Sequence, residues 1–225
     1  DQAVSISPPP SRKMWVMHSR GMKGSVFEGG FRVPCIAWWP GTIAPGTVAT
    51  EMMCHMDWWP TFAGLLGVEP PPHIWQDNDG NPIVFDGIDN SDYLLGKGPS
   101  KRDSFFFYAD QSFGGLRVQN YKFVFTAKDT WLGPAMPLTR APAVYNLYWD
   151  PGEQYDMLFN GAAPDAGSIQ TSPGRFSGAD HGWTVSMLMG PALEQHFAEI
   201  AKYPNIPSKI GGGPYYEIPP EYRPG

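Results

Sequence analysis

Cysteine is scarce in this chain of 225 residues, which has only Cys35 and Cys54. Neither stands in a CxxC pair, so the spacing typical of a zinc site is missing. Long hydrophobic runs are also missing, because no stretch of about 20 apolar residues is present that could span a membrane. Strongly basic stretches are absent and the formal net charge is -6. The sequence therefore does not favour nucleic-acid binding.

Glycine, proline and aromatic residues are plentiful instead. The chain has 26 Gly and 25 Pro, and aromatic residues make up 14% of it. Glycine and proline together amount to about 12% of an average protein, and this chain clearly exceeds that share. No repeat accompanies the excess. It predicts many turns and long ordered loops, held by aromatic side chains on a folded core.

The first hundred residues predict a strand, a helix and a loop. The apolar run at 33–39 predicts a buried strand at about 32–39, and we expect Cys35 within it to be a buried free thiol. Asp57 is a suitable N-cap for a helix over 57–66. A proline-rich loop is predicted at 68–86, with a short helix at 90–95 after it.

The loop contains one segment with two interpretations. Residues 77–81 read Asp-Asn-Asp-Gly-Asn, which suggests a calcium loop. However, Pro82 stands where an EF-hand needs glycine, and no glutamate closes the loop. A turn stabilised by the Asp77 side chain is the favoured interpretation.

The second half predicts a small antiparallel sheet with one helix. Strands are expected at 104–108, 115–118, 121–125 and 143–148. A helix is expected at 186–202, because Met189, Leu193 and Phe197 recur on one face. Overall, the pattern predicts an α/β part followed by an α+β part.

Few residues indicate chemistry by their pattern alone. Lys23 is flanked by glycines at 21, 24, 29 and 30, which let a ligand approach the backbone closely. It is a compact cation for an anionic group, or alternatively a lysine that faces solvent. His181 lies in a polar and aromatic loop that could line a pocket, so we name it as a substrate-binding candidate. His196 is interpreted as a residue of a helix face rather than a ligand.

Five segments in order resemble those of one known family. They are residues 21–34 (GMKGSVFEGGFRVP), 39–46 (WPGTIAPG), 55–61 (HMDWWPT), 86–89 (DGID) and 146–153 (NLYWDPGE). Together they are similar to the sulfatase family, of the arylsulfatase type.

The resemblance implies a fold and a division into domains. Residues 1–100 would be the C-terminal portion of a large α/β domain like that of alkaline phosphatase. Residues 101–225 would form a small C-terminal α+β domain with a four-stranded antiparallel sheet, one packed helix and an extended tail.

The resemblance also implies site residues. In sulfatases, the lysine of the KGxxxEGG segment contacts the sulfate group, and the matching residue here is Lys23. An Asp-Asn pair upstream binds a divalent cation, usually Ca²⁺. Asp1 and Gln2 stand at a plausible separation from Lys23, with Gln in place of Asn, and are the metal candidates.

One expected feature of the family is missing. Sulfatases act through a formylglycine made from the first residue of C/S-x-P-x-R, and neither Cys35 nor Cys54 begins such a motif. We therefore expect the chain to be inactive alone. The resemblance implies an N-terminal half that supplies the formylglycine, as part of the same protein or as a separate chain. The substrate would be a sulfated small molecule or glycan, in a periplasmic, secreted or lysosomal-type compartment.

Two alternatives remain open. The chain could be a non-catalytic structural or binding protein that retains the sulfatase C-terminal scaffold, which Gln2 and the missing nucleophile favour. It could also belong to a related phosphonate or phosphate monoester hydrolase that shares the general plan of the site.

Overall fold

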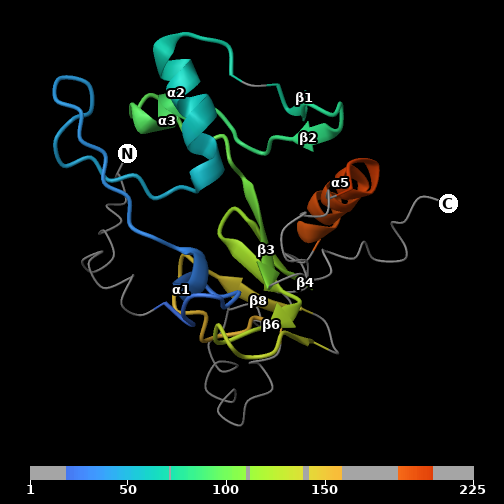
Figure 1. Ribbon diagram of the computed structural model, residues 1–225. Helices are drawn as coiled ribbons and strands as arrows, with labels where there is room; N and C mark the ends of the chain where they lie inside the picture. Colours follow the sequence, from blue (N-terminus) through green and yellow to red (C-terminus); the bar gives the residue numbers. More distant parts are fainter. Residues whose placement is uncertain (1–18, 71, 110–111, 139–141, 159–186, 205–225) are drawn as a thin grey trace.

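The computed structural model describes residues 19–70, 72–109, 112–138, 142–158 and 187–204. Its helices are α1 (Glu28–Phe31), the 3-10 helix η2 (His55–Asp57), α2 (Trp58–Leu66), α3 (Ser91–Leu94) and α5 (Met189–Lys202). Its strands are β1 (Ile74–Gln76), β2 (Pro82–Val84), β3 (Ser104–Ala109), β4 (Ser112–Val118), β5 (Tyr121–Val124), β6 (Thr126–Ala127), β7 (Met136–Pro137) and β8 (Ala143–Asn146). In Figure 1, α2, α3 and the β1–β2 hairpin lie above the main sheet.

The main sheet is antiparallel and has the order β3-β4-β5-β8. A two-residue turn joins β4 to β5, and its first residue, Gln119, has a φ of 53°. The short strands β6 and β7 form a separate two-stranded sheet, and Thr126 of β6 donates a hydrogen bond to the carbonyl oxygen of Phe113 in β4 at 2.9 Å. The antiparallel sheet predicted between 104 and 148 is therefore confirmed.

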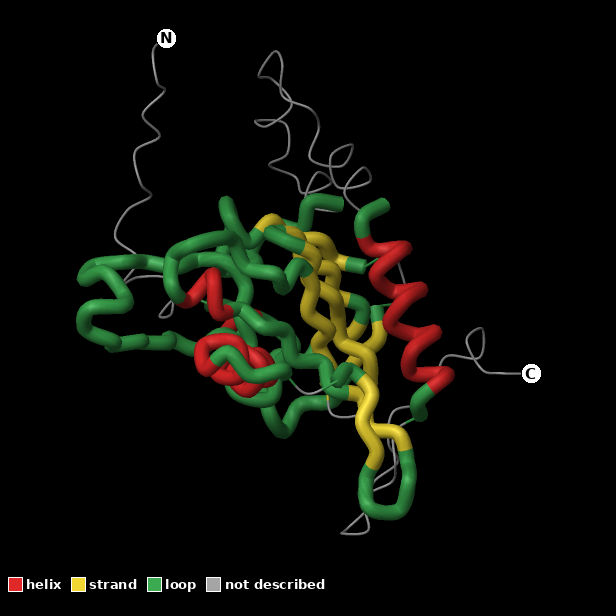
Figure 2. The backbone as a smooth tube through the Cα atoms, turned by 90° about the horizontal axis from the view of Figure 1, so that it is seen from above, coloured by secondary structure: helices red, strands yellow, loops and turns green. Residues whose placement is uncertain are grey.

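Helix α5 covers one face of the sheet. Phe197 is 5% exposed, and Leu193 and Met189 pack on a cluster that includes Leu116 and Phe123 of the sheet. Figure 2 shows α5 running along one side of the strands. The predicted helix and its buried face are confirmed within the described residues, which begin again at 187.

The opposite face is covered by a segment from the beginning of the described chain. Val26 and Phe27 are buried together with Val124 and Tyr145 of the sheet. The backbone N–H of Val26 donates to the carbonyl oxygen of Lys128 at 3.2 Å. Lys23 and its neighbours thus lie against the antiparallel sheet.

The strand predicted at 32–39 is wrong. These residues form no strand, and Ile36 and Trp38 are 94% and 85% exposed. Cys35 is likewise exposed rather than buried. A strand needs a neighbour for its backbone N–H and C=O groups, and no described strand pairs with this segment. An apolar sequence alone does not provide that neighbour.

The predicted loop at 68–86 contains a hairpin, β1–β2, which the sequence analysis missed. Its tip is the turn predicted at 77–81. The Asp77 carboxylate accepts hydrogen bonds from the backbone N–H groups of Asp79 and Asn81, at 2.9 and 2.8 Å. These local bonds support a turn stabilised by Asp77.

Candidate functional site

Lys23 lies at the tip of a tight turn. The backbone N–H of Ser25 donates to the carbonyl oxygen of Met22 at 2.9 Å, which closes the turn. Gly24 has a φ of +82°, and a Cβ there would lie 2.8 Å from the Cα of Trp131. Both the left-handed backbone and the close contact therefore require glycine after Lys23.

The ammonium group of Lys23 is available to a ligand. The side chain is exposed, and its Nζ lies 4.4 Å from the centroid of the Trp131 ring. Within the described part of the chain, no carboxylate forms an ion pair with it. A lysine that is held by an aromatic ring, and is not neutralised by an acid, can attract an anion.

Buried charges lie beneath this turn. Lys122 of β5 is fully buried, and its Nζ lies 3.1 Å from Oε1 of Glu28 and 2.9 Å from Oε1 of Glu153. The other oxygen of Glu153 accepts a hydrogen bond from the backbone N–H of Glu28 at 2.6 Å. We call Glu28, Lys122 and Glu153 the buried charge triad.

The two carboxylates of the triad differ in their pKa. Burial acts to raise the pKa of Glu28, but the nearby cations Lys122 and Arg117 outweigh it, and the pKa is lowered. Burial dominates at Glu153 and raises its pKa, despite the Lys122 ammonium. Glu28 is thus stabilised as an anion, whereas the surroundings of Glu153 disfavour its charge.

Arg20 joins the two ends of the segment that carries Lys23. Its carbonyl oxygen accepts a hydrogen bond from the backbone N–H of Gly29 at 2.8 Å. Its guanidinium lies 3.7 Å from the centroid of the Phe27 ring and donates to the hydroxyl oxygen of Tyr145 at 3.1 Å. The segment is therefore a closed loop fixed to the sheet. We call residues 20–29 the Lys23 loop.

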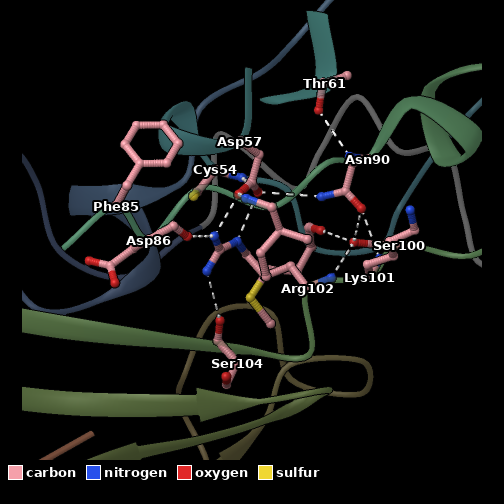
Figure 3. A network of polar contacts seen from close by, with 12 residues as sticks. Cys54, Asp57, Thr61, Phe85, Asp86, Asn90, Ser100, Lys101, Arg102 and Ser104 are labelled. Atoms are coloured by element: carbon pink, nitrogen blue, oxygen red, sulfur yellow. Dashed lines mark hydrogen bonds and ion pairs between the residues drawn. The ribbon is translucent and has the colours of Figure 1, made fainter. Parts of the chain in front are cut away.

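A second buried network connects two of the other family-like segments (Figure 3). Asp57 is fully buried, and the guanidinium of Arg102 donates to its carboxylate from Nε at 2.8 Å and from Nη2 at 2.5 Å. Arg102 Nη2 also donates to the carbonyl oxygen of Asp86 at 2.6 Å. The backbone N–H of Ile88 donates to Asp57 at 2.9 Å.

Asn90 extends the same network. Its backbone N–H donates to the hydroxyl oxygen of Thr61 at 3.0 Å, and its side-chain oxygen accepts from the N–H of Lys101 at 2.8 Å. Burial acts to raise the pKa of Asp57, but hydrogen bonds from Arg102 and the backbone outweigh it and lower the pKa. All the described partners of Asp57 and Asn90 are groups of the folded chain itself. The network therefore holds α2, the 86–90 segment and the start of β3 together.

Asp57 therefore has a different role from the one predicted. It occupies the N-cap position of α2 but makes no side-chain capping bond to that helix. Its carboxylate instead accepts from the backbone N–H of Cys54, which caps the preceding η2, and from Arg102. Arg102 was missed because it stands in the charged run 101–103, which resembles an exposed segment.

The other predicted site residues have different outcomes. Asp1, Gln2 and His181 lie outside the described residues. His196 stacks on Phe106 with 3.7 Å between ring centroids, and its Nε2 lies 2.6 Å from the Tyr108 hydroxyl oxygen. Burial lowers its pKa to about 4. This supports the interpretation of His196 as a packed residue of a helix face.

A metal ion needs several ligand side chains close together. In the described part of the chain, no group of three His, Cys, Asp or Glu side chains lies close enough to hold an ion. The metal candidates Asp1 and Gln2 lie outside the described residues, so the cation site stays a prediction. No helix in the same part is long and apolar enough to cross a bilayer.

Comparisons with known proteins point to one family. The sulfatase family model matches residues 16–68, a range that includes Lys23, Glu28 and Asp57. Arylsulfatase A of Bos taurus is 39% identical over 162 residues, which are 64% of this chain. Over this part of its length, the chain is similar to the sulfatase family. N-acetylgalactosamine-6-sulfatase of Mus musculus is 29% identical over 158 residues, or 61% of the chain.

A solved structure agrees with this assignment. The PsFucS1 sulfatase from Pseudoalteromonas sp. superimposes with a TM-score of 0.59 and 28% identity over 83% of this chain. Its matched region is 34% of that protein. The chain likewise spans 30% of the bovine sulfatase and 28% of the mouse sulfatase. It therefore shares the sulfatase fold over a region much shorter than these relatives.

Proposed function

We propose that this chain is the C-terminal part of an enzyme that hydrolyses sulfate esters, and that Lys23 contacts the sulfate group. The single observation that carries the proposal is the state of Lys23 within the family-matched range. Its ammonium is exposed, lies over an indole ring and has no described acidic partner. A sulfate oxygen would supply the missing negative charge.

In this proposal, Lys23 acts electrostatically. Negative charge on the sulfate oxygens is redistributed as the ester bond breaks, and a fixed ammonium stabilises the transition state without first reorganising. The aryl or sugar alcohol would be the leaving group. The attacking formylglycine would lie outside this chain, since neither Cys35 nor Cys54 begins a C/S-x-P-x-R motif. A Ca²⁺ site that uses Asp1 and Gln2 remains a separate proposal.

The proposed partner of this chain is the N-terminal part of the sulfatase. Two features support it. Residues 33–39 are apolar yet exposed, and α2 also exposes Trp59, Phe62 and Leu66. Exposed apolar surface of this kind is typical of an interface. The relatives also have more than twice this length. This N-terminal part would cover the exposed apolar surface and complete the large α/β domain. The proposed compartment is periplasmic, secreted or lysosomal-type.

Lys23→Ala in the complete enzyme tests the function. Loss of one preorganised donor to a developing anion typically lowers the rate by about 10²–10³. Removal of the exposed cation–ring contact should cost only about 0.5–1 kcal/mol of unfolding free energy. Lys23→Arg should restore little activity, because a planar guanidinium cannot replace a compact ammonium. The measurement is hydrolysis of an aryl sulfate, together with thermal unfolding.

The control is Lys97→Ala. Lys97 is also exposed and stands between two glycines, Gly96 and Gly98, but it lies outside the range that the sulfatase model matches. The Lys97→Ala variant should hydrolyse the aryl sulfate at a rate within a few-fold of that of the wild type. If Lys23→Ala behaves like this control, the lysine faces solvent and the proposal is wrong. An inactive wild-type protein would instead favour the non-catalytic scaffold.

A further inference from the structure

The buried charge triad lies in the least adjustable part of the sheet. Lys122 is on β5, which pairs with β4 on one side and β8 on the other. Its backbone is therefore held by both neighbours. Glu153 follows the turn after β8, and its backbone N–H donates to the carbonyl oxygen of Asp150 at 3.1 Å. Two members of the triad thus belong to the sheet and its turn, while Glu28 belongs to the Lys23 loop.

Stability alone is a poor explanation for such a cluster. Transfer of three charged groups from water into the interior is costly, and neutral side chains of similar volume often give equal or greater stability. Buried ion pairs and hydrogen bonds do, however, fix the orientation of the groups that form them. Glu153 receives Lys122 on one oxygen and the backbone N–H of Glu28 on the other. Glu28 is therefore held at its side chain and at its backbone.

Fixing Glu28 also fixes the position of Lys23. The next residue, Gly29, donates its N–H to the carbonyl oxygen of Arg20, which begins the Lys23 loop. A Cβ at Gly29 would overlap the carbonyl oxygens of Arg20 and Gly21, so the two ends of the loop lie in direct contact. Between them, the turn of Met22 and Ser25 leaves little freedom to Lys23.

We propose that Lys122 is a positioning residue, whose buried ammonium between Glu28 and Glu153 fixes the loop that presents Lys23 to the sulfate group. This inference rests on the proposed function. It also gives a role to Glu28, the glutamate of the KGxxxEGG segment: Glu28 positions the loop, whereas Lys23 contacts the sulfate. Glu28 and Lys122 do not touch the substrate. They determine where the ammonium of Lys23 lies when the substrate binds.

The test replaces the whole triad with neutral groups in the complete enzyme. The variant is Glu28→Gln, Lys122→Met and Glu153→Gln together. The triple variant removes all three buried charges of the triad, which limits the desolvation cost, but it also takes the Glu28 carboxylate from Arg117, 3.9 Å away. Its melting temperature should therefore fall less than that of Lys122→Met alone. We expect kcat for an aryl sulfate to fall at least tenfold. Glu28→Gln alone keeps Lys122 paired with Glu153, and serves as the second variant if the triple variant does not fold.

A double-mutant cycle with Lys23→Ala separates positioning from general stability. If the triad acts through Lys23, adding Lys23→Ala to the triple variant should lower kcat little further, since the two changes remove the same interaction. Phe197→Ala is the control on the opposite face of the sheet. It should lower the melting temperature and leave kcat unchanged at a temperature where the protein is folded.

Each outcome bears on one proposal. A large loss for Lys23→Ala, with near-normal kcat in the neutral variants, overturns the positioning role and leaves the function standing. Losses that multiply independently in the cycle overturn it as well. A harmless Lys23→Ala instead refutes the proposed function itself.

Discussion

The two faces of the β3-β4-β5-β8 sheet are covered in different ways. Helix α5 packs on one face with apolar side chains such as Leu193 and Phe197. The Lys23 loop packs on the other with Val26 and Phe27, but also with the buried charge triad. Apolar contacts are non-directional, whereas ion pairs and hydrogen bonds set orientation. The face that needs only stability is apolar, and the face next to Lys23 is charged.

The largest expected effect is that of Lys122→Met alone. It leaves Glu28 and Glu153 buried side by side without the cation between them. Removal of one partner of a buried pair typically costs about 3–5 kcal/mol of unfolding free energy. The cost should shrink at low pH, where the carboxylates become protonated. Chemical denaturation of the complete protein at pH 4 and pH 7 measures both. An equal cost at the two pH values would contradict this account.

Phe197→Ala examines the other face. Phe197 of α5 is buried against Phe113 of β4, and the centroids of these two rings are 5.2 Å apart. Truncation of a buried Phe costs about 3 kcal/mol at the lower end of the usual range. No ionisable group is lost, so denaturation should give the same loss at pH 4 and pH 7. A loss that depends on pH as strongly as that of Lys122→Met would mean that the two faces are not distinct.

A smaller difference is expected between the two carboxylates of the triad. The lowered pKa of Glu28 means that its stabilising contribution is present above its unfolded pKa and is lost as pH falls. The raised pKa of Glu153 has the opposite sign: the native state gains stability as pH falls through it. At pH 7, Glu28→Gln should therefore cost about 1.5–3 kcal/mol, as for a hydrogen bond to a charged group. Glu153→Gln should cost less.

Denaturation curves of the two single variants test this order. The cost of Glu28→Gln should decline below about pH 4.5, the ordinary pKa of a glutamate. Gln at position 153 can still accept the backbone N–H of Glu28, which makes the comparison a matched one. A greater cost for Glu153→Gln would show that the charge of Glu153, not that of Glu28, is the one the fold requires.

The apolar face could be predicted from the sequence because its signals are local. Met189, Leu193 and Phe197 recur at helical spacing, and the Gln119-Asn120 turn joins two short apolar runs. The charged face could not be predicted in this way. Glu28 is 94 residues from Lys122 and 125 from Glu153, so no window along the chain contains the triad.

One signal for the triad was nevertheless present. Lys122 alternates with Phe123 in β5, and alternation places it on the same face as Val124. A lysine on a face with buried valine implies a buried partner. The partners themselves are set by tertiary packing. The same is true of Asp57 and Arg102, and of residues 32–39, where the apolar pattern predicted a strand but no described strand pairs with it.

The exposed segment 32–39 has a practical consequence. Its backbone has no ladder partner among the described strands, and its side chains include Ile36 and Trp38 but no charge after Arg32. The segment is not a strand here, but its exposed apolar side chains and its backbone without a strand partner resemble the features that make an exposed strand edge pair with another copy. We therefore expect a preparation of this chain by itself to aggregate as its concentration rises. A lysine in place of Ile36 should keep it in solution, as edge lysines do in natural sheets.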